Sequence, residues 1–404
     1  MGTKNTTLLV VVVLLIVGAI IYLDGASPKN MPIGGVSVTP PSLFTSEAQV
    51  DEKTAMTDTA MEGEMKTPEK EMSTTERIAE KAKHYTLAKE LINPTGFINT
   101  PDNGPVTLQN LIGKKVILLD IWTYSCINCQ RTIPYLRSWH DKYKDKGFEI
   151  IGLHVPEFEF EKDYGNVVEA VKKLGVTWPV VLDNNSNTAR AYGMRYWPEE
   201  YLIDIDGFIV HKSIGEGNYD VTENEIQKLL KERLDVLGVE GVVDETITKI
   251  DASSSPRAQS PETYFGSSRN ELLGNGTAGV SGEKTFRLPE TFKLNTLYFG
   301  GQWNVMPEYA KSTGENAHIV FKYKARNVYF VARSKPSIAI EVLRDGVPLS
   351  GEKGADISVS ADTTKATISE SRLYKLIEND DGGEHTLHLI VPKAGLEAYT
   401  FTFG

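Results

Sequence analysis

The chain contains only two cysteines, Cys126 and Cys129, and two residues separate them. A helical pattern begins at these cysteines, directly after an apolar stretch of strand length. A thiol at the amino terminus of a helix faces unpaired N–H groups and the positive end of the helix dipole, and both stabilise a thiolate. Cys126 is therefore the predicted nucleophile. Cys129 lies one turn further along the same helical face and is predicted to resolve a mixed disulfide, so that the pair cycles between dithiol and disulfide.

Other uses of this cysteine pair fit the sequence less well. A zinc site would need two more ligands, and the nearby histidines show no ligand-like spacing. A purely structural disulfide would enclose only two residues and restrain very little chain. Two unpaired buried thiols are a further alternative. A set of two cysteines excludes a multi-disulfide scaffold and a four-thiolate zinc or iron–sulfur centre, and we predict no metal and no cofactor.

An acidic residue interrupts the apolar stretch that precedes the cysteines. Val116–Trp122 reads VILLDIW, which is typical of a central strand that is buried on both faces, yet it contains Asp120. Burial disfavours the carboxylate anion, so the pKa of Asp120 is predicted to be raised. Asp120 could then take the proton from Cys129 as that thiol attacks. The alternative is a carboxyl group that local hydrogen bonds satisfy and that has no catalytic duty.

These residues require a sheet and helices to position them. From Gly96 to about Leu237, apolar runs of strand length alternate with charged segments of helical period, and this pattern predicts an α/β sheet covered by helices. The predicted strands are 116–122, 148–153, 180–182 and 201–205, and the predicted helices are 127–144, 166–174, 188–192 and 221–237.

The motif region resembles a known family. VILLDIWTYSCINCQRTIPYL is similar to the active-site strand and helix of thioredoxin-like thiol–disulfide oxidoreductases. The resemblance places Asp120 at the family's buried aspartate, Cys126 and Cys129 at its CxxC motif, and Pro134 at the proline of its first helix. Further along the chain, YGMRYWP resembles the segment that ends in the family's cis-proline, so Pro198 is the expected counterpart.

Groups around the cysteines are predicted to meet the substrate. Proline has no N–H and adopts the cis form more readily than other residues, so Pro198 could present a bare backbone edge opposite Cys126. An extended substrate segment could pair with the backbone beside it. An ordinary turn proline is the alternative. The predicted substrate-binding side chains are Trp122, Tyr124 and Trp197.

Two groups of glutamates lie near these elements. Glu199 and Glu200 follow the expected cis-proline, where many relatives have small or hydroxyl residues, and we expect them to form a solvated acidic rim; the alternative is that they select basic or polar partners. Glu157, Glu159 and Glu161 alternate with phenylalanines, which predicts a segment with one wet side and one packed side.

A longer resemblance runs from about residue 85 to the end of the chain. GLHVPEFEFEKD and GEGNYDVTENEI are similar to the extracytoplasmic carboxy-terminal region of DipZ-type proteins of cytochrome c biogenesis. This implies a thiol–disulfide oxidoreductase that acts on protein disulfides and, if it is a reductant, a separate membrane electron donor of the CcdA type. The dipeptide between the cysteines, Ile127-Asn128, departs from the Gly-Pro of thioredoxin. The direction of electron flow stays open, because CxxC proteins span about −270 to −120 mV.

A second domain without cysteines follows. Residues 241–260 are rich in Ser, Thr and Pro and predict a linker. Over residues 261–404, short apolar runs separated by turn signals such as Asp345-Gly346 predict an all-β antiparallel sandwich. The clearest runs are 296–299, 318–323, 328–332, 338–343, 386–391 and 399–403.

This second domain resembles a carbohydrate-binding-module-like jelly roll. SPETYFGSSR and GQWNV are similar to the domain that follows the thioredoxin unit in DipZ-type proteins. A likeness in fold does not by itself establish a sugar ligand. Trp303, Tyr298 and Tyr264 could stack on a carbohydrate ring if they are exposed, although large aromatic side chains are more often buried.

The amino-terminal residues predict the compartment. Leu8–Leu23 is an uncharged apolar run with Lys4 before it and Asp24 after it, which predicts a single transmembrane anchor within residues 1–25. A cleaved signal peptide is the alternative. Either interpretation places the rest of the chain outside the cytoplasm. Residues 26–75 are polar and predict a disordered linker, and residues 76–240 are the predicted redox domain.

The sequence as a whole predicts a membrane-anchored, extracytoplasmic thiol–disulfide oxidoreductase in a bacterial-type cell envelope. The favoured function is the reduction of protein disulfides in cytochrome c maturation or disulfide repair. The formal net charge of −11 disfavours nucleic acid as a partner. One alternative is a thiol peroxidase, because Thr123 to Cys126 matches the TxxC of peroxiredoxins, although Leu119 stands where those enzymes have a proline. Another is a surface protein that binds glycan or a partner and uses the redox pair secondarily.

Overall fold

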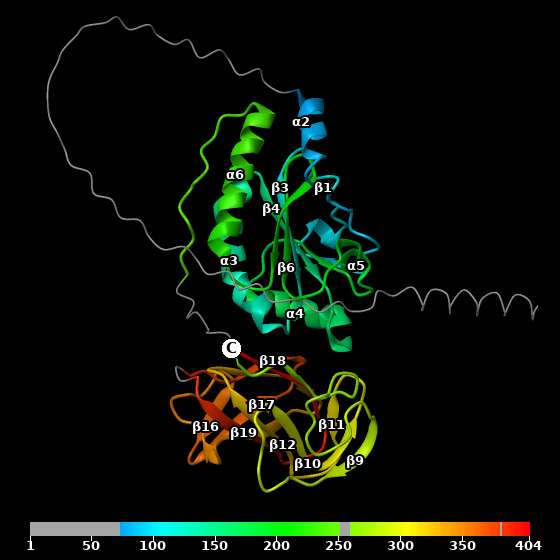
Figure 1. The fold of residues 1–404 in the computed structure, drawn as a ribbon, viewed down its shortest axis with the longest axis vertical. Coiled ribbons are helices and arrows are strands. Elements are labelled where there is room, and N and C mark those ends of the chain that lie inside the picture. The colour runs from blue at the N-terminus through cyan, green and yellow to red at the C-terminus, as the bar shows by residue number, and fades with distance from the viewer. Residues whose placement is uncertain (1–72, 251–258, 380–381) are drawn as a thin grey trace, which may run out of the picture. The chain divides into compact units, whose positions relative to one another are not determined.

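The computed structural model describes residues 73–250, 259–379 and 382–404 (Figure 1). All of them belong to one compact unit, Lys70–Gly404. Within these ranges, no helix combines the length and the apolar character needed to cross a membrane. The predicted anchor at Leu8–Leu23 and nearly all of the predicted linker at 26–75 lie outside the described residues. The membrane anchor therefore stays a prediction.

The first domain is built on one mixed sheet. Among the described residues, its seven strands run in the order β1-β7-β6-β3-β4-β5-β2. The strands are β1 (Thr86–Leu87), β2 (Gly96–Ile98), β3 (Val116–Trp122), β4 (Phe148–His154), β5 (Val180–Leu182), β6 (Glu199–Ile203) and β7 (Phe208–Ile214). β3 lies at the centre, parallel to β4 and antiparallel to β6, and every one of its residues is buried. This is the environment expected for a strand that is apolar on both faces.

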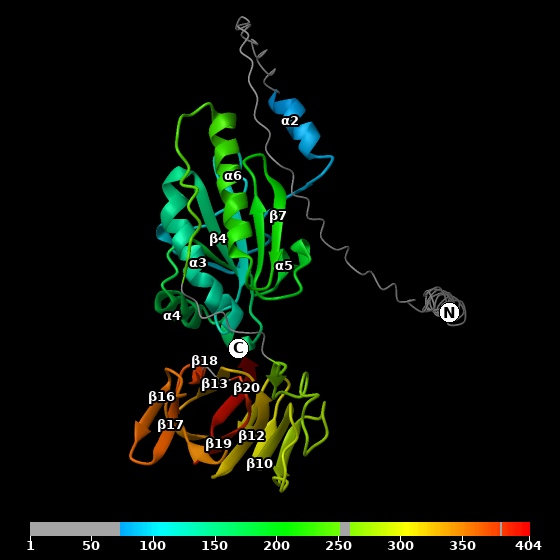
Figure 2. The ribbon, with the colours of Figure 1, turned by 60° about the vertical axis from the view of Figure 1, so that its left-hand side comes forward.

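Helices cover both faces of this sheet. The helices are α2 (Thr74–Lys81), α3 (Ile127–Tyr143), α4 (Tyr164–Leu174), α5 (Asn187–Tyr192) and α6 (Tyr219–Leu237), and the 3-10 turns are η1 (Pro101–Asn103), η2 (Lys144–Lys146) and η3 (Glu159–Lys162). Figures 1 and 2 show α3 and α6 side by side on one face, where the rings of Tyr135 and Tyr219 stack with their centroids 3.7 Å apart. α5 contributes Ala189 to the core on the opposite face.

The side chains of β3 point alternately to the two faces of the sheet, and only those on one face share a core with the cysteines. Leu118 and Trp122 point into the core that also contains Cys129 and residues of α3 and α6. Ile117, Leu119 and Ile121 point into the second core, on the opposite face of the sheet. Because successive side chains of a strand face opposite sides, Asp120 lies on the face covered by α3.

The sequence predicted most of these elements at nearly the observed bounds. The expected strands at 116–122 and 180–182 are β3 and β5, and the expected helix at 127–144 is α3. The prediction missed β1, β2 and β7. β7 lies between β6 and the short edge strand β1, and only Lys212 and Ile214 among its residues are exposed.

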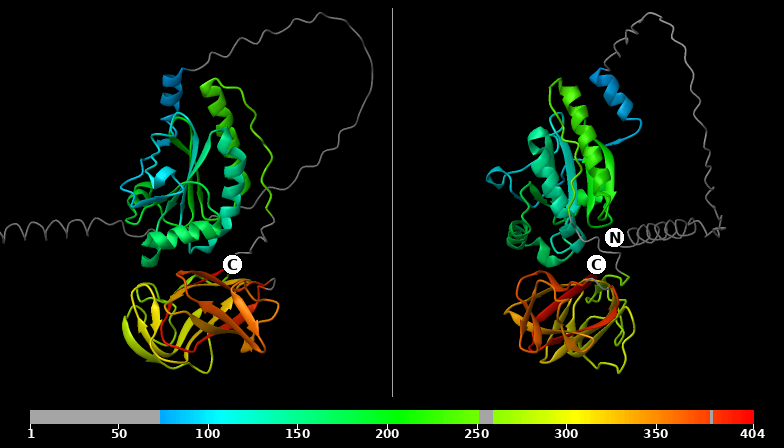
Figure 3. Two further views of the ribbon diagram at one scale, coloured as in Figure 1. Left: turned by 180° about the vertical axis from the view of Figure 1, so that it is seen from behind. Right: turned by 90° about the vertical axis from the view of Figure 1, so that its left-hand side faces the viewer.

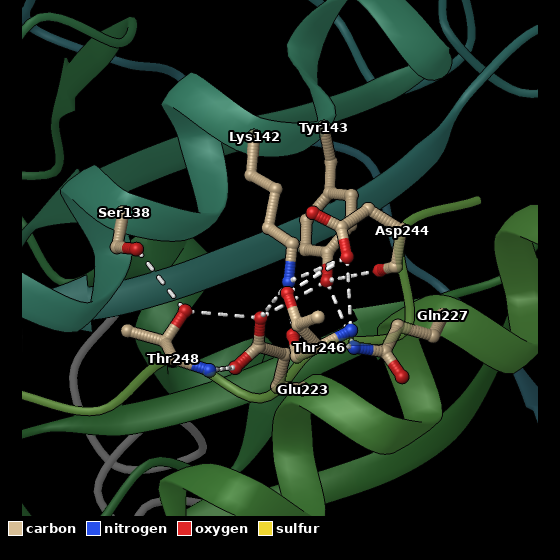
Figure 4. A network of polar contacts seen from close by, with 8 residues as sticks. All are labelled: Ser138, Lys142, Tyr143, Glu223, Gln227, Asp244, Thr246 and Thr248. Carbon is tan, nitrogen blue, oxygen red and sulfur yellow. Dashed lines mark hydrogen bonds and ion pairs between the residues drawn. The ribbon is translucent and has the colours of Figure 1, made fainter.

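Residues just after α6 are held against the first domain, although they fall within the predicted linker. Figure 4 shows Glu223 of α6 at the centre of a network with α3 and with residues 244–248. The buried Glu223 carboxylate accepts hydrogen bonds from the Thr248 N–H at 2.6 Å and from the Tyr143 hydroxyl at 2.9 Å. Tyr143 in turn accepts a hydrogen bond from Gln227 at 2.9 Å. These contacts fix the path by which the chain leaves α6.

The second domain is a large antiparallel sheet that curls into a nearly closed barrel (Figure 3). Among the described residues its strands are β8 (Thr263–Tyr264), β9 (Gly282–Phe286), β10 (Thr296–Val305), β11 (Ala310–Ser312), β12 (Ala317–Lys324), β13 (Val328–Ser334), β14 (Ile338–Arg344), β15 (Val347–Pro348), β16 (Ile357–Ser360), β17 (Thr363–Ile368), β18 (Arg372–Ile377), β19 (Glu384–Val391) and β20 (Leu396–Phe403). Strand β10 pairs with β12 on one side and with β9 and β11 on the other, so it connects the two halves of the sheet. The all-β, antiparallel prediction is confirmed, and the jelly-roll, carbohydrate-binding-module assignment stays a prediction.

The aromatic residues proposed to stack on a sugar are covered by protein. Trp303 is fully buried and donates a hydrogen bond from Nε1 to the Gly300 carbonyl at 2.9 Å. Tyr298 is buried as well. The half-buried ring of Tyr264 lies 3.6 Å from the guanidinium of Arg269, measured from ring centroid to Cζ. These side chains serve the packing of the domain, as the more common fate of large aromatic residues suggests.

Candidate active site

Cys126 occupies the N-cap position of α3. Its backbone is extended, with φ −79° and ψ 121°, and its carbonyl accepts the hydrogen bond of the Gln130 N–H at 3.0 Å. The thiol is half-buried, and Cys126 and Cys129 are both free thiols. The geometry therefore puts the more accessible sulfur at the amino terminus of α3, as predicted for the nucleophile.

Cys129 lies behind Cys126, within the core under the sheet. Its side chain is buried, and burial raises the pKa of its thiol well above the ordinary value. Cys126 and the negative charge of Asp120 raise this pKa further. Cys129 therefore needs a base in order to become a nucleophile.

Asp120 is a buried carboxyl group on the face of the sheet that α3 covers. Burial raises the pKa of Asp120 to about 7, and its Oδ1 has no hydrogen-bond partner among the described residues. On β4 its register partner is Gly152, which adds no side chain on that side. A carboxyl group with a pKa close to neutrality can both accept and return a proton under physiological conditions.

The loop before β6 closes the other side of the site. The Trp197–Pro198 peptide bond is cis, and the Cys126 thiol lies 3.9 Å from the Trp197 carbonyl oxygen, to which it can donate a weak hydrogen bond. Pro198 itself is buried, and its carbonyl accepts a hydrogen bond from the Gly215 N–H at 2.8 Å. Pro198 is thus adjacent to Cys126 in space, although it is remote in sequence.

The three aromatic side chains predicted to bind substrate occupy different environments. Trp197 is half-exposed, and its Nε1 donates to the Val155 carbonyl at 3.0 Å. Trp122 is buried edge-on against His154. Tyr124 is buried, and its hydroxyl donates to the Ser371 carbonyl of the second domain at 3.1 Å. Trp197 is the one of the three with ring surface open to a partner, and the exposed Tyr196 beside it, which the sequence analysis did not single out, adds to that surface.

A buried glutamate supports the loop that carries Cys126. The structure contradicts the expectation of a solvated Glu161, because this residue is fully buried at η3. Its carboxylate accepts hydrogen bonds from the Ser125 hydroxyl at 2.6 Å and from the N–H groups of Glu157 and Phe158 at 2.7 and 3.0 Å. Burial raises the pKa of Glu161, while the hydrogen bonds from Ser125 and Thr123 oppose that rise. Glu161 therefore fixes the residue that precedes the nucleophile.

The expected acidic rim is also wrong, because Glu199 and Glu200 are both buried. Glu199 pairs with Lys212 at 3.0 Å and accepts a hydrogen bond from the Tyr201 hydroxyl at 2.8 Å. Although burial raises the pKa of Glu199, its hydrogen bonds and Lys212 hold that pKa below the ordinary value. Burial raises the pKa of Glu200 to about 8, and the charge of Asp120 contributes to the rise. The two neighbours therefore differ, since only Glu199 has a cationic partner.

A cluster of carboxylates elsewhere in the domain is already occupied by a lysine. Asp204, Asp206 and Glu232 are the only group in the described residues with metal-like geometry. The Lys81 ammonium lies 2.6 Å from Asp204 and 2.7 Å from Asp206 and also pairs with Glu232. This cluster attaches α2 to the turn between β6 and β7, which is a structural role.

Comparison with known proteins agrees with this geometry. Residues 88–230 match the Redoxin family, and residues 260–404 match the thioredoxin-like C-terminal domain family. The chain is 38% identical to Protein DipZ of Mycobacterium bovis over 318 residues, which cover 78% of this chain and 43% of DipZ. It thus spans less than half the length of that relative.

Shorter relatives match the first domain. The chain is 32% identical to the thiol-disulfide oxidoreductase ResA of Bacillus cereus over 136 residues, which cover 34% of this chain and 75% of ResA. A solved thiol:disulfide interchange protein from Bacteroides sp. is 26% identical with a TM-score of 0.29, and the match covers 35% of this chain and 89% of that one. The sequence relatives and the CxxC motif at the start of α3 carry the assignment: the chain belongs to the thioredoxin-like thiol–disulfide oxidoreductases.

Proposed function

We propose that this thiol–disulfide oxidoreductase is tethered to the membrane, faces the outside of the cytoplasm and reduces disulfides of other proteins. The observation that carries the reductive cycle is the contrast between the two cysteines. Cys126 is half-buried at a helix amino terminus, whereas Cys129 is buried beside Asp120. The first sulfur is accessible to a protein disulfide, and the second is reserved for an internal attack.

The cycle balances in two steps. The Cys126 thiolate attacks a substrate disulfide, forms a mixed disulfide and expels one substrate thiolate. Asp120 then accepts the Cys129 proton, and the Cys129 thiolate attacks the Cys126 sulfur and expels the second substrate thiolate. The substrate gains two electrons and leaves as two thiolates that solvent protonates. Asp120 holds the proton from Cys129, and the enzyme is left with a Cys126–Cys129 disulfide.

A dithiol donor must restore the reduced enzyme. If Leu8–Leu23 anchors the chain at the outer face of the membrane, the electrons have to come through a membrane protein, and a donor of the CcdA type fits this requirement. The substrates would then be extracytoplasmic disulfides, such as those formed during cytochrome c maturation or those that need repair. The match to DipZ covers 318 residues, more than either domain contains, so the likeness extends through both domains of this chain.

Two further roles would use the same chain differently. If the protein were a thiol peroxidase, a peroxide rather than a protein disulfide would oxidise Cys126. A glycan-binding role would depend on the second domain, in which Trp303 and Tyr298 are buried. The disulfide reductase is favoured because Cys126 lies against the Trp197–Pro198 backbone, where an extended peptide can pair.

Trapping of the mixed disulfide tests the proposal. In a full-length Cys129→Ser variant the second step is blocked, so Cys126 should remain joined to its substrates. Non-reducing electrophoresis of the membrane fraction should show adducts that dithiothreitol removes. The Cys126→Ser/Cys129→Ser variant is the matched control and should show none.

Loss of the adducts from the membrane fraction when residues 1–25 are deleted would support the anchor. Absence of protein adducts, together with rapid turnover of peroxide, would favour the peroxidase instead.

A further inference from the structure

We propose that Glu200 shares a proton with Asp120, and that this carboxyl pair, rather than Asp120 alone, exchanges the proton with Cys129. The inference rests on the proposed thiol–disulfide cycle and deepens it. Asp120 is the group that lies next to the reacting thiol, whereas Glu200 acts through Asp120 and is a positioning residue.

The register of two strands brings the carboxyl groups together. β3 and β6 are antiparallel, and Asp120 is the direct partner of Glu200. Two residues away on each strand, Leu118 pairs with Leu202, and both of these residues belong to the core that contains Cys129. Side chains at directly opposed positions lie on the same face, with Cβ atoms about 4.5–5.5 Å apart. Asp120 and Glu200 therefore face each other beneath α3.

Neither carboxyl group has a cation to neutralise it. Asp120 and Glu200 are each 3% exposed, and in the described parts of the chain no lysine or arginine forms an ion pair with either. Two poorly solvated carboxylates at directly opposed positions of neighbouring strands repel each other when both are ionised, so the pair is expected to hold one proton over a wide pH range. The raised pKa values of both groups agree with this expectation.

The other ionisable groups around the pair do not supply a positive charge. From α3 come Cys126 and Cys129, and Arg131 of the same helix is engaged by Glu216 at 2.6 Å. From α6 comes Tyr219, whose pKa burial raises to about 12 and whose hydroxyl lies 3.2 Å from Thr132 Oγ1. On β7 the partner of Glu200 is Ser213, and on β4 the partner of Asp120 is Gly152. The shared proton is therefore the main compensation available to the pair.

A shared proton suits both directions of the cycle. With one carboxyl protonated and the other ionised, a base is present for the Cys129 proton when Cys129 attacks the mixed disulfide. After that transfer the pair carries two protons, and it can return one to Cys129 when a donor dithiol reduces the Cys126–Cys129 disulfide. A single buried carboxyl group with a pKa near neutrality would be protonated in part of the molecules, and those molecules would have no base for the Cys129 proton.

The test follows the internal attack by Cys129 in the full-length protein. Reaction of the reduced enzyme with 5,5′-dithiobis(2-nitrobenzoate) releases one thionitrobenzoate when Cys126 is modified and a second when Cys129 attacks, and the rate of the second release is recorded against pH. The wild type should show two apparent pKa values that belong to the pair as a unit. Glu200→Gln and Asp120→Asn should each leave only one of them. Glu199→Gln is the matched control, because it removes the neighbouring buried carboxyl group that pairs with Lys212, and it should keep both.

A second measurement protects the test against variants that fold poorly. Infrared spectra of wild-type protein labelled with ¹³C in its Asp and Glu carboxyl groups should show a protonated carboxylic acid at neutral pH that disappears at higher pH. Persistence of both apparent pKa values in folded Glu200→Gln, or absence of that infrared band, would overturn the shared proton. If the wild type releases no second thionitrobenzoate, the proposed thiol–disulfide cycle itself fails, which is a separate outcome.

Discussion

The two domains bury different kinds of side chain. In the redox domain Asp120, His154, Glu161 and Glu200 are buried around the cysteines, and further buried carboxyl groups, such as Asp204 and Glu223, lie elsewhere in the domain. In the described part of the second domain, Glu397 is the one buried carboxylate, and both Lys311 and Arg333 pair with it. An unpaired buried carboxyl group costs stability, so its presence calls for a compensating role. The contrast indicates that the first domain carries the chemistry, while the interior of the second domain is built for stability.

The buried histidine His154 of the redox domain is not a candidate for this proton transfer. His154 is fully buried and stacks on Tyr124 with ring centroids 5.7 Å apart. Burial lowers the pKa of His154 to about 3, so it is neutral at physiological pH. The interior around the cysteines therefore offers carboxyl groups, and no buried imidazolium, to handle the proton of Cys129.

Replacing the nucleophile should give the largest effect. Cys126→Ser removes the only thiol that a protein disulfide can reach, so the rate of disulfide reduction should fall by about 1,000-fold or more. Insulin reduction with dithiothreitol as the electron donor measures this rate. Because Cys126 is half-buried at the surface of α3, the free energy of unfolding should change little. Substantial residual activity in the variant would mean that the chemistry resides outside the CxxC motif and would remove the contrast between the domains.

Asp120→Asn should reveal the cost of the buried carboxyl group. The folded state raises the pKa of Asp120 from 3.8 to about 7, so between these values the folded protein binds a proton that the unfolded chain has lost. The stability of the wild type therefore falls as pH rises from about 4 to 7, and the loss persists above pH 7. Asparagine cannot ionise, so the variant should gain a few kcal/mol relative to wild type between pH 4 and pH 8.

Urea denaturation of the wild type and of Asp120→Asn at pH 4 and at pH 8 measures this gain in the free energy of unfolding. Asp206→Asn is the matched control, because Arg77 and Lys81 hold the pKa of the Asp206 carboxyl below its ordinary value. The Asp206 carboxylate thus stabilises the fold at neutral pH, and its variant should lose stability relative to wild type as pH rises. A pH-independent difference for Asp120→Asn would show that this carboxyl group ionises normally in the folded protein.

Local sequence patterns were sufficient for the elements and for the reactive pair. The run VILLDIW predicted β3, and a helix that starts at a cysteine predicted the placement of Cys126, because both features depend on neighbouring residues. In the second domain, the apolar runs at 318–323 and 338–343 fall within β12 and β14 for the same reason. What these runs do not specify is which strands pair, so the curled, continuous sheet was not foreseen.

The buried glutamates were missed for a related reason. Glu199 and Glu200 look like a solvent-exposed acidic dipeptide, and only the pairing of β6 with β3 shows that Glu200 faces Asp120. The alternation of Glu161 with phenylalanines predicts a side chain that faces solvent. In the structure, η3 turns this side chain inward to the N–H groups of residues 157 and 158. Long-range register and irregular turns decide these positions, and neither leaves a periodic signal in one sequence.

A tryptophan replacement in each domain should give the smallest effect and the sharpest comparison. Trp303→Phe reduces a fully buried side chain and leaves the Gly300 carbonyl without its donor, so the free energy of unfolding should fall by about 1–3 kcal/mol. Trp139→Phe in α3 reduces an equally buried side chain whose Nε1 has no partner among the described residues, so it should cost less. Below the unfolding transition, Trp303→Phe should keep the rate of disulfide reduction within about twofold of wild type, because the replaced ring packs on Phe299 inside the second domain. If the rate of disulfide reduction by Trp303→Phe falls well below this twofold range, the packing of the second domain is coupled to the cysteines, and the division of labour between the domains does not hold.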